Sequence, residues 1–148
     1  MLKYSLPAAA LMVVGLTACL DDPSGPQCQP FANETTETRG DTVVTEVGLR
    51  YIVIEPGATQ QVAEWCVQAQ VQYVGTLLDG TEFDSGTHVF TPGADNTIPG
   101  FMFGVVGMKV DERRRLIIPP NLAYGSQGAA DIPPNSTVIF DVELIATQ

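Results

Sequence analysis

The most regular pattern of apolar and polar positions lies between residues 67 and 75, where small or apolar residues alternate with the glutamines at positions 68, 70 and 72. A period of two predicts a strand with one buried face. Asp79-Gly80 follows, a pair that tolerates the positive φ of a tight turn, and the chain then resumes in extended form. Residues 67–84 therefore predict a β-hairpin whose return strand carries Phe83 and Asp84.

Three further segments are rich in β-branched and aromatic residues and predict strands: residues 49–55, 115–119 and 137–146. Residues 86–96 and 119–136 are expected to be loops, the second of a length that is usually functional. Residues 98–108 are apolar on all sides, with proline near the start and glycine near the end, which favours a short helix that a sheet must cover. The pattern predicts an α+β domain with about five antiparallel strands and one short helix.

The start of the chain has the composition of an export signal. Lys3 precedes an apolar run that is too short to span a membrane, and the segment ends in Leu16-Thr17-Ala18-Cys19. This ending resembles the bacterial lipobox, in which the cysteine is acylated and becomes the new N-terminus. We therefore expect residues 1–18 to be a lipoprotein signal peptide and Cys19 to anchor an exported protein to a bacterial membrane, on the periplasmic or cell-surface side. An ordinary signal peptide with a chance cysteine is the alternative.

Residues 19–46 are polar and are expected to form a flexible tether in front of a domain over residues 47–148. Removing Lys3 with the signal peptide leaves 6 of the 7 basic residues against 17 acidic ones, a net charge of −11. This excess of acid argues against nucleic acid as a partner. Lys109 and the three arginines at 113–115 are interpreted as the solvated start of a strand rather than as a binding patch.

The cysteines suggest one covalent link. Once Cys19 is acylated, Cys28 and Cys66 are the only cysteines left to pair in an oxidising compartment. A disulfide between them would pin the tether to the predicted hairpin. Two free thiols are the alternative.

Short motifs in a fixed order run from about Gly48 to the end of the chain. They are Tyr73-Val74-Gly75, Asp79-Gly80, Phe83-Asp84-Ser85, Ile98-Pro99-Gly100-Phe101, Gly107-Met108, Ala123-Tyr124-Gly125, Ile132-Pro133-Pro134 and Phe140-Asp141-Val142-Glu143-Leu144. In this order the motifs resemble the FK506-binding protein family of peptidyl-prolyl cis-trans isomerases. The resemblance implies a five- to six-stranded antiparallel sheet curled around one short helix, which agrees with the fold that the periodicity predicts.

The resemblance also implies an apolar pocket between the helix and the sheet. The matching positions are Tyr73, Phe83, Asp84, Phe90, Ile98, Phe101, Tyr124, Ile132 and Phe140. Tyr124 and Asp84 are the stronger candidates, since a polar group in an apolar pocket needs a partner or a purpose, whereas the apolar residues also suit a core. The family usually has tryptophan where this chain has Phe101, and phenylalanine where it has His88.

The implied activity requires no nucleophile. Rotation about an X-Pro bond must break amide resonance, a barrier of about 18–20 kcal/mol, and no covalent bond is made or broken. An apolar site disfavours the planar ground state and so favours the twisted amide. In the family the substrate carbonyl accepts hydrogen bonds from a tyrosine hydroxyl and a backbone amide, at positions that match Tyr124 and Ile98, while Asp84 would orient polar groups at the wall.

We therefore expect a monomeric isomerase that acts on X-Pro bonds of exported proteins and binds the macrolide inhibitors of the family. A lipid-anchored module that binds proline-containing segments, or acts as a chaperone with little turnover, needs the same pocket and is the alternative. A hydrolase fits poorly, because His88 is the only histidine and neither a catalytic triad nor a multi-histidine metal site can be assembled from the usual residues. We expect no metal and no other cofactor.

Overall fold

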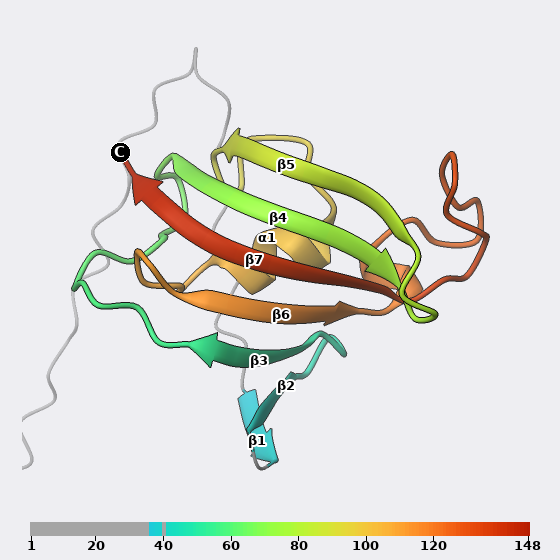
Figure 1. Ribbon diagram of the computed structural model, residues 1–148, viewed down its shortest axis with the longest axis horizontal. Helices are drawn as coiled ribbons and strands as arrows, with labels where there is room; N and C mark the ends of the chain where they lie inside the picture. Colours follow the sequence, from blue (N-terminus) through green and yellow to red (C-terminus); the bar gives the residue numbers. More distant parts are fainter. Residues whose placement is uncertain (1–35, 40) are drawn as a thin grey trace, which may run out of the picture.

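The computed structural model describes residues 36–39 and 41–148. Its elements are β1 (Thr36–Arg39), β2 (Thr42–Thr45), β3 (Arg50–Glu55), β4 (Ala69–Leu77), β5 (Glu82–Phe90), α1 (Pro99–Val105), β6 (Arg113–Ile118), the 3-10 helix η1 (Pro120–Leu122) and β7 (Val138–Thr147). The seven strands form one antiparallel sheet in the order β1-β2-β3-β6-β7-β4-β5. The sheet curves across one side of α1 (Figure 1). The predicted α+β architecture, an antiparallel sheet curled around one short helix, is confirmed.

The predicted hairpin is formed by β4 and β5. Gly80 in its turn has a φ of +88°, and the Thr81 amide donates to Asp79 Oδ1 at 2.9 Å. The strand at the C-terminal end, β7, alternates as predicted and buries every second side chain from Val138 to Leu144. It lies between β6 and β4 at the centre of the sheet, which explains why its apolar face is the most regular in the chain.

Two segments differ from the prediction. β5 continues to Phe90, through residues that were expected to form a loop, because the whole length of β4 is available to pair with it from Ala69 to Thr76. β1 and β2 lie inside the predicted tether, which therefore does not extend to residue 46. Both extensions are at the edges of the sheet, where pairing satisfies the backbone without demanding an apolar side-chain pattern.

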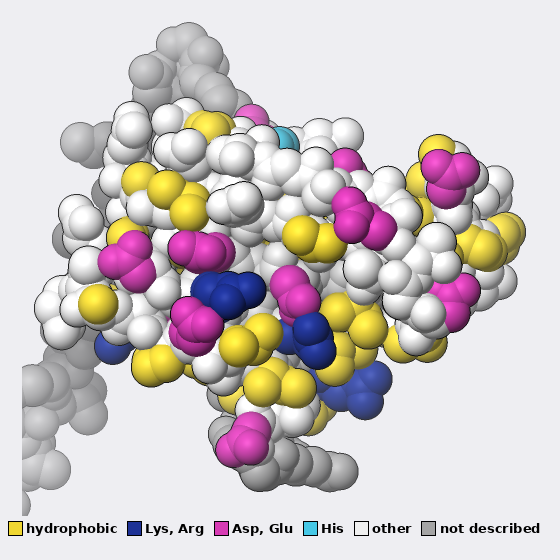
Figure 2. Space-filling model, in the orientation of Figure 1, with side chains coloured by type: hydrophobic (Ala, Val, Ile, Leu, Met, Phe, Trp, Pro, Cys, Tyr) yellow, Lys and Arg dark blue, Asp and Glu magenta, His cyan; other side chains and the backbone are white. Residues whose placement is uncertain are grey.

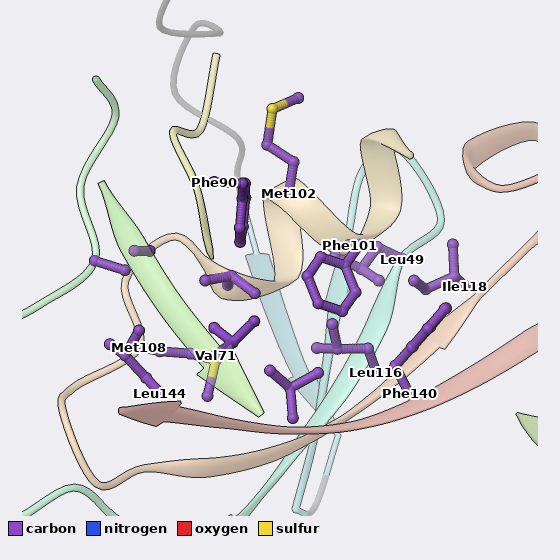
Figure 3. Close-up of a cluster of buried hydrophobic side chains, with 14 of the residues drawn as sticks. Leu49, Val71, Phe90, Phe101, Met102, Met108, Leu116, Ile118, Phe140 and Leu144 are labelled. Carbon is purple, nitrogen blue, oxygen red and sulfur yellow. The ribbon is translucent and has the colours of Figure 1, made fainter. Parts of the chain in front are cut away.

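The core lies between α1 and the sheet. Phe101 points from the helix towards Leu116 of β6 and Phe140 of β7 (Figure 3). A side chain at Gly104 would overlap that of Leu116, and one at Gly100 would overlap that of Ile118. Glycine weakens a helix by roughly 1 kcal/mol relative to alanine, but here it allows α1 to lie directly on β6. The short helix is therefore held by packing.

One part of the basic cluster is misread by the sequence pattern. Arg113 and Arg115 are exposed, and Figure 2 shows basic side chains next to acidic ones over this part of the sheet. Arg114, in contrast, is buried and donates to Glu112 Oε1 from Nε at 2.8 Å and from Nη2 at 2.6 Å. The interpretation of a wholly solvated strand start is therefore wrong for Arg114. The alternation of the strand turns this residue inward, and Glu112 compensates its charge.

Of the residues that the N-terminal predictions name, the structure describes Cys66, which is disulfide-bonded. Its predicted partner Cys28, the acylation site Cys19 and the signal peptide over residues 1–18 lie outside the described residues. Among residues 36–39 and 41–148, no helix is long and apolar enough to cross a membrane.

Candidate functional site

A cavity of about 310 Å³ opens beside the start of α1, between the β4–β5 hairpin and the loop that follows η1. It is lined by Tyr73, Asp84, His88, Asn96, Thr97, Ile98, Phe101, Tyr124 and Phe140. Aromatic rings make up much of its surface, and a few polar groups converge on it, which is the composition of a site for a small or extended ligand. Among the described residues, no group of His, Cys, Asp and Glu side chains is placed to hold a metal ion.

Four aromatic rings form the apolar part of the site. Phe101 lies edge-on to Phe140 with ring centroids 5.1 Å apart and edge-on to Tyr73 at 5.8 Å. Phe83 lies edge-on to Phe140 at 5.5 Å. The absence of a side chain at Gly75 permits this arrangement, since a Cβ there would be 2.8 Å from both the Phe83 and the Phe140 ring. The predicted motif Tyr73-Val74-Gly75 therefore supplies one ring and the space for two others.

Asp84 is held by a tyrosine hydroxyl. The Tyr73 hydroxyl donates to Asp84 Oδ2 at 2.8 Å, diagonally across a register in which Asp84 pairs with Gly75, two residues further along β4. Burial, followed by the hydrogen bond to the Asp84 carboxylate and the negative charge of that group, raises the pKa of Tyr73 to about 12. At neutral pH the phenol is therefore protonated and fixes one carboxylate oxygen. The other oxygen of Asp84 accepts no hydrogen bond from the described residues.

Two donors at the cavity are not used within the described part of the chain. The Tyr124 hydroxyl donates to no protein group there, and burial followed by the nearby Asp84 charge raises its pKa, so it stays protonated at neutral pH. The Ile98 amide donates to no carbonyl in the described part of the chain, because it lies at the start of α1, where backbone amides have no acceptor within the helix. The Ile98 carbonyl, in contrast, accepts the first helical bonds, from Phe101 and Met102. Both donors are free for an acceptor that enters the cavity.

The structure places six of the predicted site residues in this cavity: Tyr73, Asp84, Ile98, Phe101, Tyr124 and Phe140. Phe83 and Ile132 line a second, smaller cavity of about 170 Å³ that shares Asp84 and Tyr124 with the first. Phe90 lies behind the wall, 1% exposed, with its ring 5.7 Å from Phe101. It supports the floor and does not line the cavity.

The sequence pattern missed three lining residues. His88 stacks on Phe90 with centroids 5.3 Å apart and presents its ring to the cavity. Asn96 and Thr97 precede the helix and come to the cavity with Ile98. The sequence predicts a loop over residues 86–96, but His88 belongs to β5, where period two counted from Asp84 indicates the same face.

Comparison with known proteins agrees with this geometry. Residues 56–145 match the family described as FKBP-type peptidyl-prolyl cis-trans isomerase. The chain is 54% identical over 82 residues to FK506-binding protein 2 of Dictyostelium discoideum, which covers 51% of this chain and 62% of that protein. The crystal structure of FkpA from Escherichia coli is similar with a TM-score of 0.67 and 37% identity, over 75% of this chain and 53% of that one. A peptidyl-prolyl cis-trans isomerase structure from Pseudomonas syringae pv. tomato also has a TM-score of 0.67, with 31% identity over 75% of this chain and 84% of that one.

Fold and site together define an α+β domain with a partly aromatic cavity at the start of α1. The family match covers more than half of the chain, and the chain therefore belongs to the FKBP-type peptidyl-prolyl cis-trans isomerase family. It spans 62% of the length of the Dictyostelium relative and 53% of the E. coli structure.

Proposed function

We propose that the protein is a peptidyl-prolyl cis-trans isomerase that acts on X-Pro bonds of exported polypeptides. The observation that carries the proposal is a pair of unused donors, the Ile98 amide and the Tyr124 hydroxyl, on a cavity of about 310 Å³ whose other walls are largely aromatic. A prolyl ring fits against Phe101, and the carbonyl before it accepts from these donors.

Catalysis in this site is by differential binding. The twisted amide has lost conjugation and carries a smaller dipole than the planar form, so aromatic walls favour it relative to the ground state. Tyr73 holds one oxygen of Asp84 and leaves the second to orient polar groups of the substrate. No step needs a charged nucleophile or a proton transfer, which agrees with protonated tyrosines at neutral pH.

A chymotrypsin-coupled assay on a short peptide with one X-Pro bond tests the proposal, with macrolide as competitor. We expect faster cis-to-trans conversion in proportion to enzyme and its loss on adding macrolide. Binding of the peptide without faster conversion would instead support a proline-binding or chaperone module. Failure to bind peptide or macrolide would overturn both.

We further propose that the protein is exported and anchored through acylated Cys19. The support is the Leu16–Cys19 ending, which lies outside the described residues. Cys19→Ser should convert a membrane-bound protein into a soluble or uncleaved one while the domain remains folded. Unchanged processing and membrane fractionation of the Cys19→Ser variant would overturn the anchor and leave the isomerase proposal untouched.

A further inference from the structure

The second cavity differs in charge from the first. It has a volume of about 170 Å³ and is lined by Phe83, Asp84, Tyr124, Ala129, Ala130, Asp131 and Ile132. The two cavities share Asp84 and Tyr124, so a chain that places proline in the first passes the second with a neighbouring residue. No Lys or Arg lines either cavity, whereas two carboxylates from different elements line the second, Asp84 from β5 and Asp131 from the loop after η1.

These carboxylates have no ion-pair partner among the described residues. On the outer face of the sheet, by contrast, exposed acids pair with bases, as in the bond from Arg115 Nε to Asp141 Oδ1 at 2.7 Å. At the end of the molecule that carries the loop after η1, at the right of Figure 2, the visible charged side chains are acidic. The cavity therefore has a negative rim that nothing in the described part of the chain neutralises.

The position of Asp131 is fixed by the backbone of its turn. The Ile132 amide donates to the Ala129 carbonyl at 2.6 Å, and the Ala129 amide donates to the Ile132 carbonyl at 3.0 Å. The Gly128 amide donates to the Tyr124 carbonyl at 3.2 Å. Asp131 is thus held in a closed turn that is tied to the tyrosine of the main site, and it is not a residue of a free loop.

Apolar walls and an acidic rim suit one type of side chain. Lys and Arg place an aliphatic stem along apolar surface and keep the charged head in water or against a carboxylate. Ala129 and Ala130 leave room for such a stem beside Phe83 and Ile132. We propose that Asp131, together with Asp84, makes the second cavity a subsite that selects substrates with Lys or Arg next to the proline. This inference rests on the proposed function, because proline must occupy the first cavity.

The test compares matched peptides of the form Ala-Xaa-Pro-Phe, with Lys, Leu or Glu as Xaa, and a second set with Xaa after the proline. In wild type we expect kcat/KM to be highest for Lys and lowest for Glu in one of the sets. Asp131→Asn should lower the Lys-to-Leu ratio about two- to fivefold, the range of a partly exposed ion pair, and added salt should lower it in wild type. Asp131→Lys should reverse the order of Lys and Glu.

The control is Glu64→Gln, which removes the same charge from an exposed residue that lines neither cavity. Its Lys-to-Leu ratio should equal that of wild type. Equal ratios for Asp131→Asn and Glu64→Gln, in thermally stable proteins, would overturn the subsite. Peptide affinities from fluorescence anisotropy separate the two proposals: a Lys preference in binding without turnover would contradict the isomerase alone, and turnover without preference would contradict the subsite alone.

Discussion

Two polar arrangements lie at the two ends of α1 and differ in how fully their groups are used. Beyond the C-terminus of the helix, Arg114 donates to Glu112 and to the Gly104 carbonyl, and its guanidinium lies 4.3 Å from the centre of the Tyr51 ring. At the N-terminus, the Ile98 amide and a tyrosine hydroxyl face a cavity and donate to nothing in the described part of the chain. Buried groups with complete partners stabilise the fold, whereas unused donors at a cavity indicate where a ligand binds.

The largest effect on stability is expected at the C-terminal end of α1, where the buried polar groups have partners. Arg114→Met should lower the free energy of unfolding by about 3–5 kcal/mol, because Glu112 would remain buried with its charge unpaired. Equilibrium urea unfolding measures the loss. The double variant Arg114→Met with Glu112→Met should recover much of it, because it leaves no unpaired charge.

Arg115→Met is the matched control for that measurement. Arg115 pairs with Asp141 through two bonds of 2.7 Å, but both side chains are partly exposed, so the loss should be about 1 kcal/mol or less. Equal losses for the variants at 114 and 115 would contradict the distinction between a buried and an exposed pair.

A second structural link is expected at Cys66, which is disulfide-bonded at the start of the hairpin. We predict that its partner is Cys28, and that closing the loop between them stabilises by about 3–4 kcal/mol in the chain-entropy model. Peptide mapping without reduction should recover the 28–66 cross-link, and Cys66→Ser should lower the midpoint of thermal unfolding. Alkylation of Cys28 in the denatured, non-reduced protein would contradict the pairing.

The fold was largely predictable because its central elements obey simple periods. The alternation in β7 and β4 follows from one buried face, and the all-apolar segment around Phe101, with proline near its start and glycine near its end, favours a covered helix. The edge strands were not predictable, because β1, β2 and the end of β5 depend on hydrogen bonds to a neighbour and not on their own side chains.

The site was predictable where a residue type is unusual for its place. Tyr124 and Asp84 are the stronger candidates because they are polar groups in a mostly apolar set, and both line the cavity, as does the third polar member, Tyr73. His88 was not found because its segment was expected to be a loop, and Phe90 was expected at the wall because the sequence does not distinguish a ring that lines a cavity from one that lies behind it. Arg114 shows the same limit, since its neighbours are exposed arginines.

At the cavity beside the N-terminus of α1, Tyr124→Phe should lower kcat/KM about fivefold. This is the effect of losing one neutral hydrogen bond to the substrate, which contributes about 1 kcal/mol. Stability should change little, since the hydroxyl has no partner among the described residues. Tyr51→Phe is the matched control, because Tyr51 lies under Arg114 and outside the cavity. An unchanged rate for Tyr124→Phe would assign Tyr124 to packing.

The Tyr73 hydroxyl, which donates to Asp84, is expected to show a smaller effect, a change in its pKa. The pKa of Tyr73 is raised to about 12, so between about pH 10 and that value the unfolded state releases a proton that the native state keeps, and stability falls as pH rises. Asp84→Asn should lower the pKa of Tyr73 only in part, because burial is the larger cause. Phenolate absorbance during a pH titration measures the pKa of Tyr73, with the Tyr73→Phe variant as the blank. The same Tyr73 pKa in wild type and in Asp84→Asn would contradict the influence of the carboxylate.

The smallest change is expected from enlarging the floor of the site. Phe101 has rings on three sides, with centroids of Phe140, Phe90 and Tyr73 at 5.1, 5.7 and 5.8 Å, and the cavity on the remaining side. A tryptophan introduced there has space only towards the cavity, where it would bury more apolar surface against a prolyl ring and add an indole N–H. Phe101→Trp should therefore raise isomerase activity or macrolide affinity by about two- to fivefold.

The tryptophan emission of Phe101→Trp also tests whether residue 101 contacts the ligand. The native tryptophan, Trp65, lies edge-on to Phe103 at 5.9 Å and does not line the cavity, so a ligand-dependent change in emission comes from position 101. Wild type, titrated in parallel, is the control for any response of Trp65. If the variant folds normally and its added emission is indifferent to saturating proline peptide and macrolide, residue 101 does not contact the ligand. The unused donors beside it would then serve a ligand bound elsewhere in the cavity, because a prolyl ring seated on the floor must change the surroundings of that indole.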